Sequence, residues 1–331
     1  MAVLMQGLEG WYVQSGENTF IEIHGLIDRE QNLESRAQRI YEAIKLEDRN
    51  QSDWLESYIR EAVTANPNQP SLEIYRAAMD ALVARRGERQ WAQKATSYIF
   101  YAEDLLKSIP GSRMIYLLRN PWDLSASKKR RNPSSDRFFS LSLSWAKGVQ
   151  ITSRLEQDYP DRFKLVRYED LVSTPQKVIQ DLCDWLGEPF SEHLLDVPHV
   201  NPSENKVQAG GHYGHQLLLE QSACDSSAKV SRGEETSTGL NPSKMCKYQT
   251  LLDTHEIARV DQLLLLFRSR HLIRRHYPDM PHQFGSHSLK AHTRASIGLP
   301  LAPARYCLNY LTQIKRRPSY LLSRSIRRFR A

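Results

Sequence analysis

A short apolar run that ends at a proline turn places the tightest constraint on the fold. Residues 114–118 read Met-Ile-Tyr-Leu-Leu, which is strand length and lacks alternation with polar residues. A run of this kind, bounded by turn residues, is typical of a strand buried on both faces of a parallel sheet. Arg119-Asn-Pro121 ends the run, and a helix is predicted from Asp123 to about Lys129. The chain is therefore expected to contain a parallel α/β layer.

The segments that follow repeat this alternation. FKLVRYEDL (163–171) predicts a second buried strand, and Ser173 to Pro175 predict the start of a helix that Gly187 ends. Further helices are expected at residues 28–62, at 72–85 with Ser71 as N-cap, at 141–157 and at 251–271. Strands alternating with helices indicate an α/β domain, which we place at residues 1–284.

Composition limits the class of protein. The chain has 331 residues, of which 40% are hydrophobic and 25% charged, typical of a globular protein. No apolar stretch approaches the roughly 20 residues of a membrane span, and the first residues do not resemble a signal peptide. The four cysteines form no CxxC pair, which argues against a zinc cluster and a disulfide framework. A cytoplasmic protein with reduced thiols is expected.

Positive charge is concentrated near the end of the chain. Residues 285–331 contain ten Lys or Arg and no Asp or Glu, and subtracting these ten charges from the net +7 leaves −3 for residues 1–284. The charge therefore does not indicate specific nucleic-acid binding by the main domain. We treat residues 285–331 as a basic C-terminal tail. It is either a solvated extension or a segment that touches an acidic surface.

Arg119 is the first candidate site residue. Ligands of open α/β sheets bind beyond the carboxyl ends of strands, and the planar fork of an arginine matches phosphate oxygens. Ser127 lies eight residues further on, on the predicted helix, where it adds a hydroxyl donor. The spacing alone also fits an alternative, in which Arg119 pairs with Asp123 and Ser127 faces solvent.

Four segments, in order, resemble the sulfotransferases that use 3′-phosphoadenosine 5′-phosphosulfate (PAPS). LLRNPWDLSAS (117–127) resembles their 3′-phosphate-binding motif, and QWAQKATSYIFYAEDLL (90–106) resembles their W-x-x-K-T-P segment. DRFKLVRYEDLVSTPQKVIQDLCDWLGEPF (161–190) resembles their RYEDL strand and the helix after it, and GENTFIEI (16–23) resembles their P-E-T-x-F-F stretch. The resemblance implies a P-loop-type parallel sheet flanked by helices. It also implies transfer of a sulfuryl group from PAPS to a hydroxyl or amine, without a metal.

The resemblance also implies roles for single residues. Arg119 and Ser127 would hold the 3′-phosphate, and Lys244 is a further candidate for binding PAPS. Lys94 would stabilise charge on the transferred group, although this chain reads K-A-T where the family has K-T-P. Glu17 would act as general base toward the acceptor. The alternatives are a solvated lysine at a helix start and an exposed loop carboxylate. The RYEDL carboxylates are expected to be structural, close to a helix start.

One part of the family pattern is not recognisable. The family opens with a buried strand and a G-x-x-R-S-G-T-T loop whose backbone N–H groups bind the 5′-phosphosulfate. Here only Gln14-Ser15-Gly16 resembles it, without a strand of β-branched residues before it and without a basic residue. We therefore expect the first strand and its loop to be missing, and activity to be impaired. Residues 1–16 either replace them or mark a truncated reading frame.

Other functions remain open at this point. A non-catalytic nucleotide- or partner-binding protein of the same fold is the main alternative, and a P-loop kinase is disfavoured because the chain lacks GxxxxGK[ST]. His212 and His215 have the spacing of a metal pair but no Cys or acidic partner at ligand spacing, so a loop is favoured. Acceptor pockets are built by variable loops, which leaves a small molecule, a sugar or a protein as acceptor.

Overall fold

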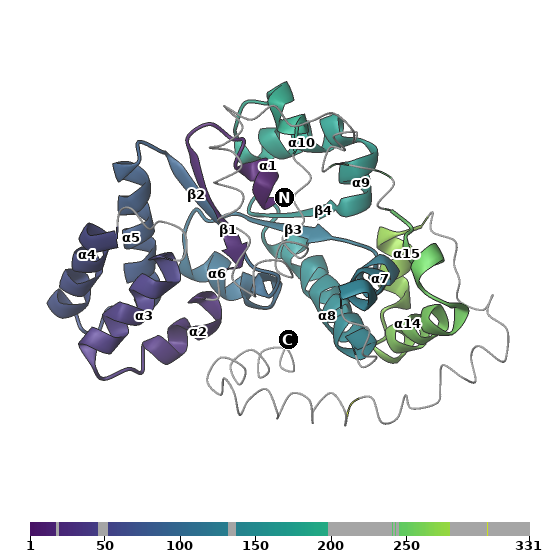
Figure 1. The fold of residues 1–331 in the computed structure, drawn as a ribbon, viewed down its shortest axis with the longest axis horizontal. Coiled ribbons are helices and arrows are strands. Elements are labelled where there is room, and N and C mark those ends of the chain that lie inside the picture. Colours follow the sequence, from purple (N-terminus) through teal and green to yellow (C-terminus); the bar gives the residue numbers. More distant parts are fainter. Residues whose placement is uncertain are drawn as a thin grey trace, which may run out of the picture. The chain divides into compact units, whose positions relative to one another are not determined.

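The fold is α/β, as predicted. A computed structural model describes residues 1–17, 20–45, 52–131, 137–197, 240, 242, 245–278 and 303 (Figure 1). The chain divides into two compact units, unit 1 with residues 1–98 and 179–240, and unit 2 with residues 99–178 and 241–331. Each unit contains a pair of parallel strands together with helices.

Unit 1 is built on strands β1 (Trp11–Glu17) and β2 (Gln90–Lys94). Parallel strands need a long crossover, and here it consists of helices α2 (Phe20–Ile27), α3 (Leu33–Lys45), α4 (Ser52–Ala65) and α5 (Ser71–Arg85). Helix α1 (Ala2–Met5) precedes β1, and a 3-10 turn covers Glu192–Leu195. Trp11 pairs with Gln90 and Glu17 with Lys94, with an irregularity in register between Gln14 and Glu17.

The sequence analysis did not identify β1 or β2, and it saw no strand of β-branched residues before Gly16, whereas β1 runs through Gln14-Ser15-Gly16. The reason is a buried polar contact that breaks the apolar pattern. Gln14 is 1% exposed, and the Tyr75 hydroxyl donates to Gln93 Oε1 at 2.6 Å while lying 3.3 Å from Gln14 Oε1. Tyr75 also stacks on Phe20, with 4.1 Å between ring centres. Gln14 therefore belongs to the core, and the half-buried Gln93 lies at its edge, although both residues are polar.

The start of α5 also differs from the prediction. Ser71 is the first helical residue and Pro70 takes the N-cap position. The Ser71 N–H donates to Asp28 Oδ1 at 2.7 Å, and its hydroxyl donates to the His24 carbonyl at 3.1 Å. A carboxylate from a neighbouring element thus satisfies the helix start, in place of the serine itself.

Unit 2 is built on strands β3 (Met114–Leu118) and β4 (Phe163–Arg167), which pair residue for residue. Helices lead into and out of these strands. In chain order they are α6 (Ala102–Ser108), α7 (Pro121–Arg131), α8 (Arg137–Asp158), α9 (Tyr168–Ser173) and α10 (Pro175–Leu186). A 3-10 turn at Tyr98–Tyr101 precedes α6. The residues of α10 are divided between the two units. The last helices are α13 (Tyr248–Leu251), α14 (Thr254–Leu266) and α15 (Arg270–His276).

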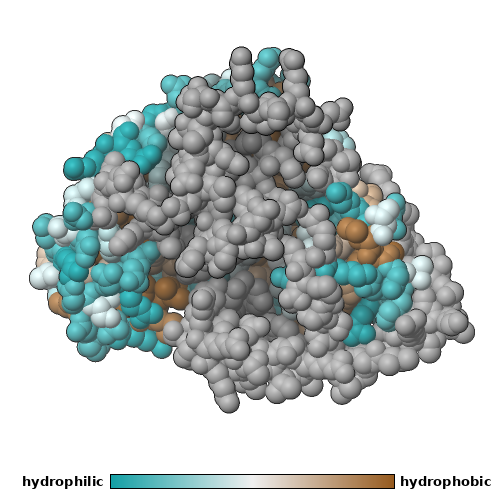
Figure 2. All heavy atoms as spheres, viewed as in Figure 1, coloured by the Kyte–Doolittle hydropathy of each residue, from teal (hydrophilic) through white to brown (hydrophobic). Residues whose placement is uncertain are grey.

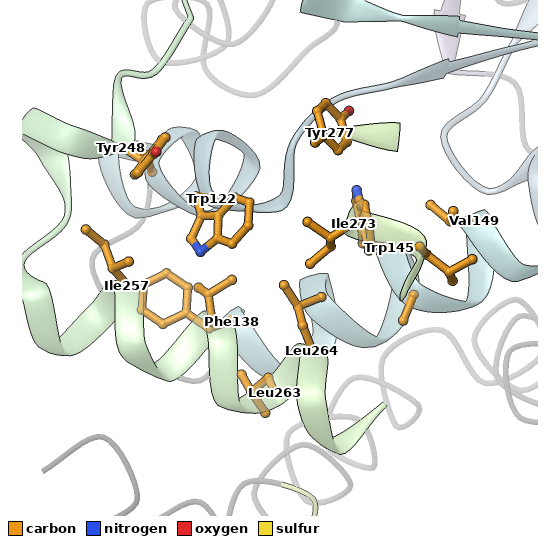
Figure 3. Close-up of a cluster of buried hydrophobic side chains, with 14 of the residues drawn as sticks. Trp122, Phe138, Trp145, Val149, Tyr248, Ile257, Leu263, Leu264, Ile273 and Tyr277 are labelled. Carbon is orange, nitrogen blue, oxygen red and sulfur yellow. The ribbon is translucent and has the colours of Figure 1, made fainter. Parts of the chain in front are cut away.

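The core of unit 2 lies between α7, α8, α14 and α15 (Figure 3). Trp122, Trp145 and Tyr248 supply large rings, and Leu263 and Leu264 point into the cluster from α14. Both indoles keep a hydrogen-bond partner. Trp122 Nε1 donates to Asp261 Oδ1 at 2.8 Å, and Trp145 Nε1 donates to the Arg119 carbonyl at 2.9 Å. The core thereby fixes the chain at the point where β3 ends.

Three predictions for unit 2 need correction. β3 has the predicted bounds, but of its residues only Leu118 is buried and the others are half-buried. The strand predicted at 163–171 ends at Arg167, because Tyr168–Ser173 forms a helix whose first turn holds Glu169 and Asp170. The helix predicted at 251–271 is interrupted, since Asp253 and Glu256 form a capping box that starts α14 and Arg268 adopts a left-handed backbone with φ 54°.

The described surface is mainly hydrophilic on the face drawn in Figure 2, with smaller hydrophobic areas among the polar side chains. In the part of the chain that the structure describes, four large hydrophobic residues are exposed: Tyr58, Leu251, Leu265 and Leu266. No helix within that part is long and apolar enough to cross a membrane.

Candidate functional site

Arg119 directly follows β3, at the carboxyl end of the β3–β4 sheet. Its Nη2 lies 3.5 Å from Asp123 Oδ2, and its Cζ lies 4.5 Å from the centre of the Tyr168 ring. The side chain is 22% exposed. The guanidinium is therefore oriented by a carboxylate and an aromatic ring and still reaches solvent, an arrangement suited to binding an anion.

The ion pair with Asp123 is the alternative that the spacing suggested, and the structure contains it. It does not exclude phosphate binding, because a guanidinium carries five N–H donors in a planar fork. Ser127 is half-buried, so it is not a fully solvent-facing residue as the alternative supposes. It lies one helical turn after Asp123, and residues at this spacing share one helix face. Asp123 therefore neighbours both candidate residues: it pairs with Arg119 and shares a helix face with Ser127.

Asp123 is a fully buried carboxylate that binds several donors. It accepts hydrogen bonds at 3.0 Å from the Asn120 side-chain amide and from the backbone N–H groups of Cys246 and Tyr248. Its own N–H donates to Asn120 Oδ1 at 2.7 Å, which fixes the first turn of α7. Cys246 has a left-handed backbone with φ 53°, a conformation that costs about 1 kcal/mol outside glycine. Asp123 therefore holds the segment before α13 against the start of α7.

Glu169 joins the ends of the two strands. Its Oε1 accepts hydrogen bonds from the Asn120 backbone N–H and side-chain amide, both at 2.9 Å. Asn120 follows β3 and Glu169 follows β4, so these bonds lock the two strand ends together. Arg167 bonds Asp170 within the same segment, with Nε–Oδ2 at 2.8 Å. The structural role expected for the RYEDL carboxylates is confirmed.

The surroundings raise the pKa of two groups near Arg119. Burial raises the pKa of the Tyr168 hydroxyl, against the lowering effect of Arg119, so this phenol stays neutral at neutral pH. Burial, followed by the charges of Asp123 and Glu169, raises the pKa of the Cys246 thiol. A thiol kept protonated is a poor nucleophile, so Cys246 is not a candidate for covalent catalysis.

The two predicted catalytic residues belong to unit 1. Glu17 and Lys94 are the last residues of β1 and β2 and are partners in the parallel register. Lys94 is exposed, as the alternative of a solvated lysine expects, but it ends a strand and does not start a helix. Ser97, three residues after Lys94, donates its hydroxyl to the buried Glu22 of α2, five residues after Glu17. The side chain of Glu17 lies outside the described atoms.

Lys244 lies outside the described residues, as do His212, His215 and the tail from residue 285, with the exception of Pro303. Within the described part, no group of three or more His, Cys, Asp or Glu is arranged to hold a metal ion.

Sequence reasoning missed two contributors to the Arg119 environment. Tyr168, which it grouped with a structural motif, forms the ring beneath the guanidinium. Asn120 connects Asp123 with Glu169, and its only sequence signal is the Asn-Pro dipeptide, which marks a turn at a strand end.

The comparison with protein families agrees with the resemblance found in the sequence. A family model described as "Sulfotransferase family" matches residues 13–192, more than half of the chain. The match begins within β1 and covers Glu17, Lys94, Arg119 and Ser127. The chain therefore belongs to the sulfotransferase family.

Solved structures of sulfotransferase domains are also similar. The sulfotransferase domain from the curacin biosynthetic pathway is 20% identical, covers 72% of this chain and 89% of its own, and has a TM-score of 0.41. The sulfotransferase domain from the Synechococcus PCC 7002 olefin synthase is 20% identical, covers 78% and 94%, and has a TM-score of 0.42. No curated protein matches the chain.

Proposed function

We propose that this protein transfers a sulfuryl group from PAPS to a hydroxyl or amine acceptor. Arg119 carries the proposal. It is a partly exposed guanidinium at the carboxyl end of a parallel strand, oriented by Asp123 and Tyr168. This is where α/β folds bind phosphorylated ligands, and family membership points to PAPS as the donor.

Arg119 and Ser127 would bind the 3′-phosphate of PAPS. The arginine supplies charge and two parallel N–H donors just before α7, and the serine supplies one hydroxyl from within α7. The polar contacts of Asp123, Asn120 and Glu169 hold this region in place before the ligand arrives. Such preorganisation lowers the cost of ordering side chains on binding.

Lys94 and Glu17 are the proposed catalytic pair. In the transfer, a bond forms between the acceptor oxygen or nitrogen and sulfur while the bond between sulfur and the leaving phosphate oxygen breaks. Lys94 would stabilise the negative charge on the leaving oxygen, and Glu17 would accept the acceptor proton. Their pairing at the ends of adjacent strands supports assigning them to one catalytic step.

Binding of the product nucleotide 3′-phosphoadenosine 5′-phosphate (PAP) tests the phosphate site. Calorimetry should show about 10–100-fold weaker binding for Arg119→Ala, because charged hydrogen bonds to phosphate are lost. Arg113→Ala is a matched control, since Arg113 is an exposed arginine just before the opposite end of β3, and it should bind like the wild type. Equal affinity of Arg119→Ala and wild type would overturn the site.

A non-catalytic nucleotide-binding protein is the second candidate function. It is favoured by one observation, namely that residues 14–20, which run from the end of β1 to the start of α2, contain no Lys or Arg to neutralise a phosphosulfate. Incubation with sulfur-labelled PAPS and mixed hydroxyl and amine acceptors separates the two. Transfer that falls about 10²–10³-fold in Lys94→Ala, with PAP binding retained, supports catalysis. PAP binding without any transfer supports the non-catalytic function.

A further inference from the structure

The exposed residues at the end of α14 and on α15 form a surface that belongs neither to the phosphate site nor to the core. Leu265 and Leu266 are 48% and 54% exposed, more than any other large hydrophobic residue in the described part of the chain. Other leucines of the same helix, Leu263 and Leu264, are fully buried in the core. The helix therefore buries one face and presents two adjacent leucines to solvent at its last turn.

Several arginines lie shortly after these leucines in the sequence. Residues 265–278 contain four arginines and no Asp or Glu. α15 buries Leu272 and Ile273, so its remaining face is basic. The exposed basic residues of this stretch are Arg268, Arg270, His271, Arg274 and Arg275. Arg275 is partly committed to Glu156 on α8, at 3.4 Å, whereas Arg268 lies at the turn between the two helices.

Apolar side chains beside a row of cations match one kind of surface. An anionic lipid bilayer offers acidic headgroups at its surface and hydrocarbon a few ångströms below, and it binds segments that carry both features. Nucleic acid would account for the arginines but leaves the exposed leucines unexplained. The tail from residue 285 has no acidic residue, so it would be repelled by this surface and is a poor candidate to cover it.

We propose that Leu265 and Leu266, with Arg268, Arg270 and Arg274, dock this protein on anionic membranes. The leucines enter the boundary between headgroups and acyl chains, and the arginines contact the headgroups. This proposal is independent of the sulfuryl-transfer function, because none of these residues belongs to the Arg119 region. It concerns peripheral binding to one leaflet, and it would place the protein near lipid-borne or membrane-associated acceptors.

Co-sedimentation of the full chain with phosphatidylcholine vesicles, with and without phosphatidylserine, tests the proposal. The wild type should bind only the vesicles that contain phosphatidylserine, and added salt should weaken binding. Arg268→Gln/Arg274→Gln should reduce the partition coefficient about fivefold for each charge removed. Leu265→Gln/Leu266→Gln should reduce it on the order of tenfold without changing the charge.

Two control variants separate docking from a general charge effect. Arg76→Gln/Lys107→Gln removes the same number of exposed positive charges elsewhere, and Tyr58→Gln removes an exposed hydrophobic residue from α4. Both should bind vesicles like the wild type. Wild-type binding by the leucine and arginine variants would overturn the proposal and assign any lipid affinity to the tail. Loss of duplex DNA binding in the arginine variant, with vesicle binding unchanged, would overturn it in favour of nucleic acid.

Discussion

Glu169 accepts two hydrogen bonds from Asn120, one from the backbone and one from the side chain, both at 2.9 Å. The two residues are 49 positions apart in the sequence, and each lies two residues after the end of its strand, Asn120 after β3 and Glu169 after β4. This contact holds the ends of β3 and β4 together at the carboxyl end of the sheet, next to Arg119.

Glu169→Ala should destabilise the protein by about 2–4 kcal/mol, because it leaves two buried donors of Asn120 without their acceptor. The midpoint of urea unfolding measures the change. Glu103→Ala is the matched control, since Glu103 pairs with Lys107 at the surface, at 2.6 Å, and its loss should cost no more than about 0.5 kcal/mol. Equal midpoints for the two variants would show that the Asn120 contact contributes little.

Gly148 on α8 packs against Tyr116 of β3. A Cβ built at Gly148 would lie 2.6 Å from the Tyr116 hydroxyl oxygen, too close for any real contact. Gly148→Ala should therefore destabilise the protein by about 1–3 kcal/mol in urea unfolding. Adding Tyr116→Phe removes the clashing oxygen, and the double variant should recover part of this loss. Gly25→Ala has open space around its Cβ and should not destabilise. Additive effects of the two substitutions would contradict the steric explanation.

The sequence predicts the fold best where apolar residues are continuous. Met114–Leu118 was predicted to the residue because five apolar residues stand between turn signals. β1 and β2 escaped prediction because Gln14 and Gln93 are polar residues that the Tyr75 hydroxyl approaches within the fold. A pattern search cannot recognise such a contact, since the partner lies on a helix elsewhere in the chain.

In the candidate site, too, local motifs could be predicted from the sequence and contacts between distant residues could not. Arg119 and Ser127 could be proposed from a local motif and the rule on strand ends. The environment of Arg119 could not, because Tyr168 and the backbone N–H of Cys246 reach it only through tertiary packing. Local sequence thus indicates the candidate binding side chains, whereas distant residues determine how firmly they are held.

The free energy of unfolding should fall at alkaline pH because the buried hydroxyl of Tyr116 loses its proton there. Burial raises the pKa of this hydroxyl from 10.0 to about 12, so the folded state holds the proton more tightly than the unfolded state does. Its contribution, about 2–3 kcal/mol, is complete below about pH 10 and is lost as the pH rises toward about 12. Urea midpoints across this range should fall less steeply in Tyr116→Phe than in the wild type. Parallel pH profiles would show that Tyr116 is not the group responsible.

The ring of Tyr168 should contribute to phosphate binding through Arg119. The guanidinium lies 4.5 Å from the ring centre, and a cation–π contact at a partly exposed site is worth about 0.5–2 kcal/mol. Tyr168→Leu should therefore weaken PAP binding several-fold in calorimetry, whereas Tyr168→Phe keeps the ring and should bind nearly as well as the wild type. In the Arg119→Ala background the leucine substitution should have little further effect, because the cation it supports is gone. An equal loss in both backgrounds would mean that Tyr168 acts on the nucleotide directly.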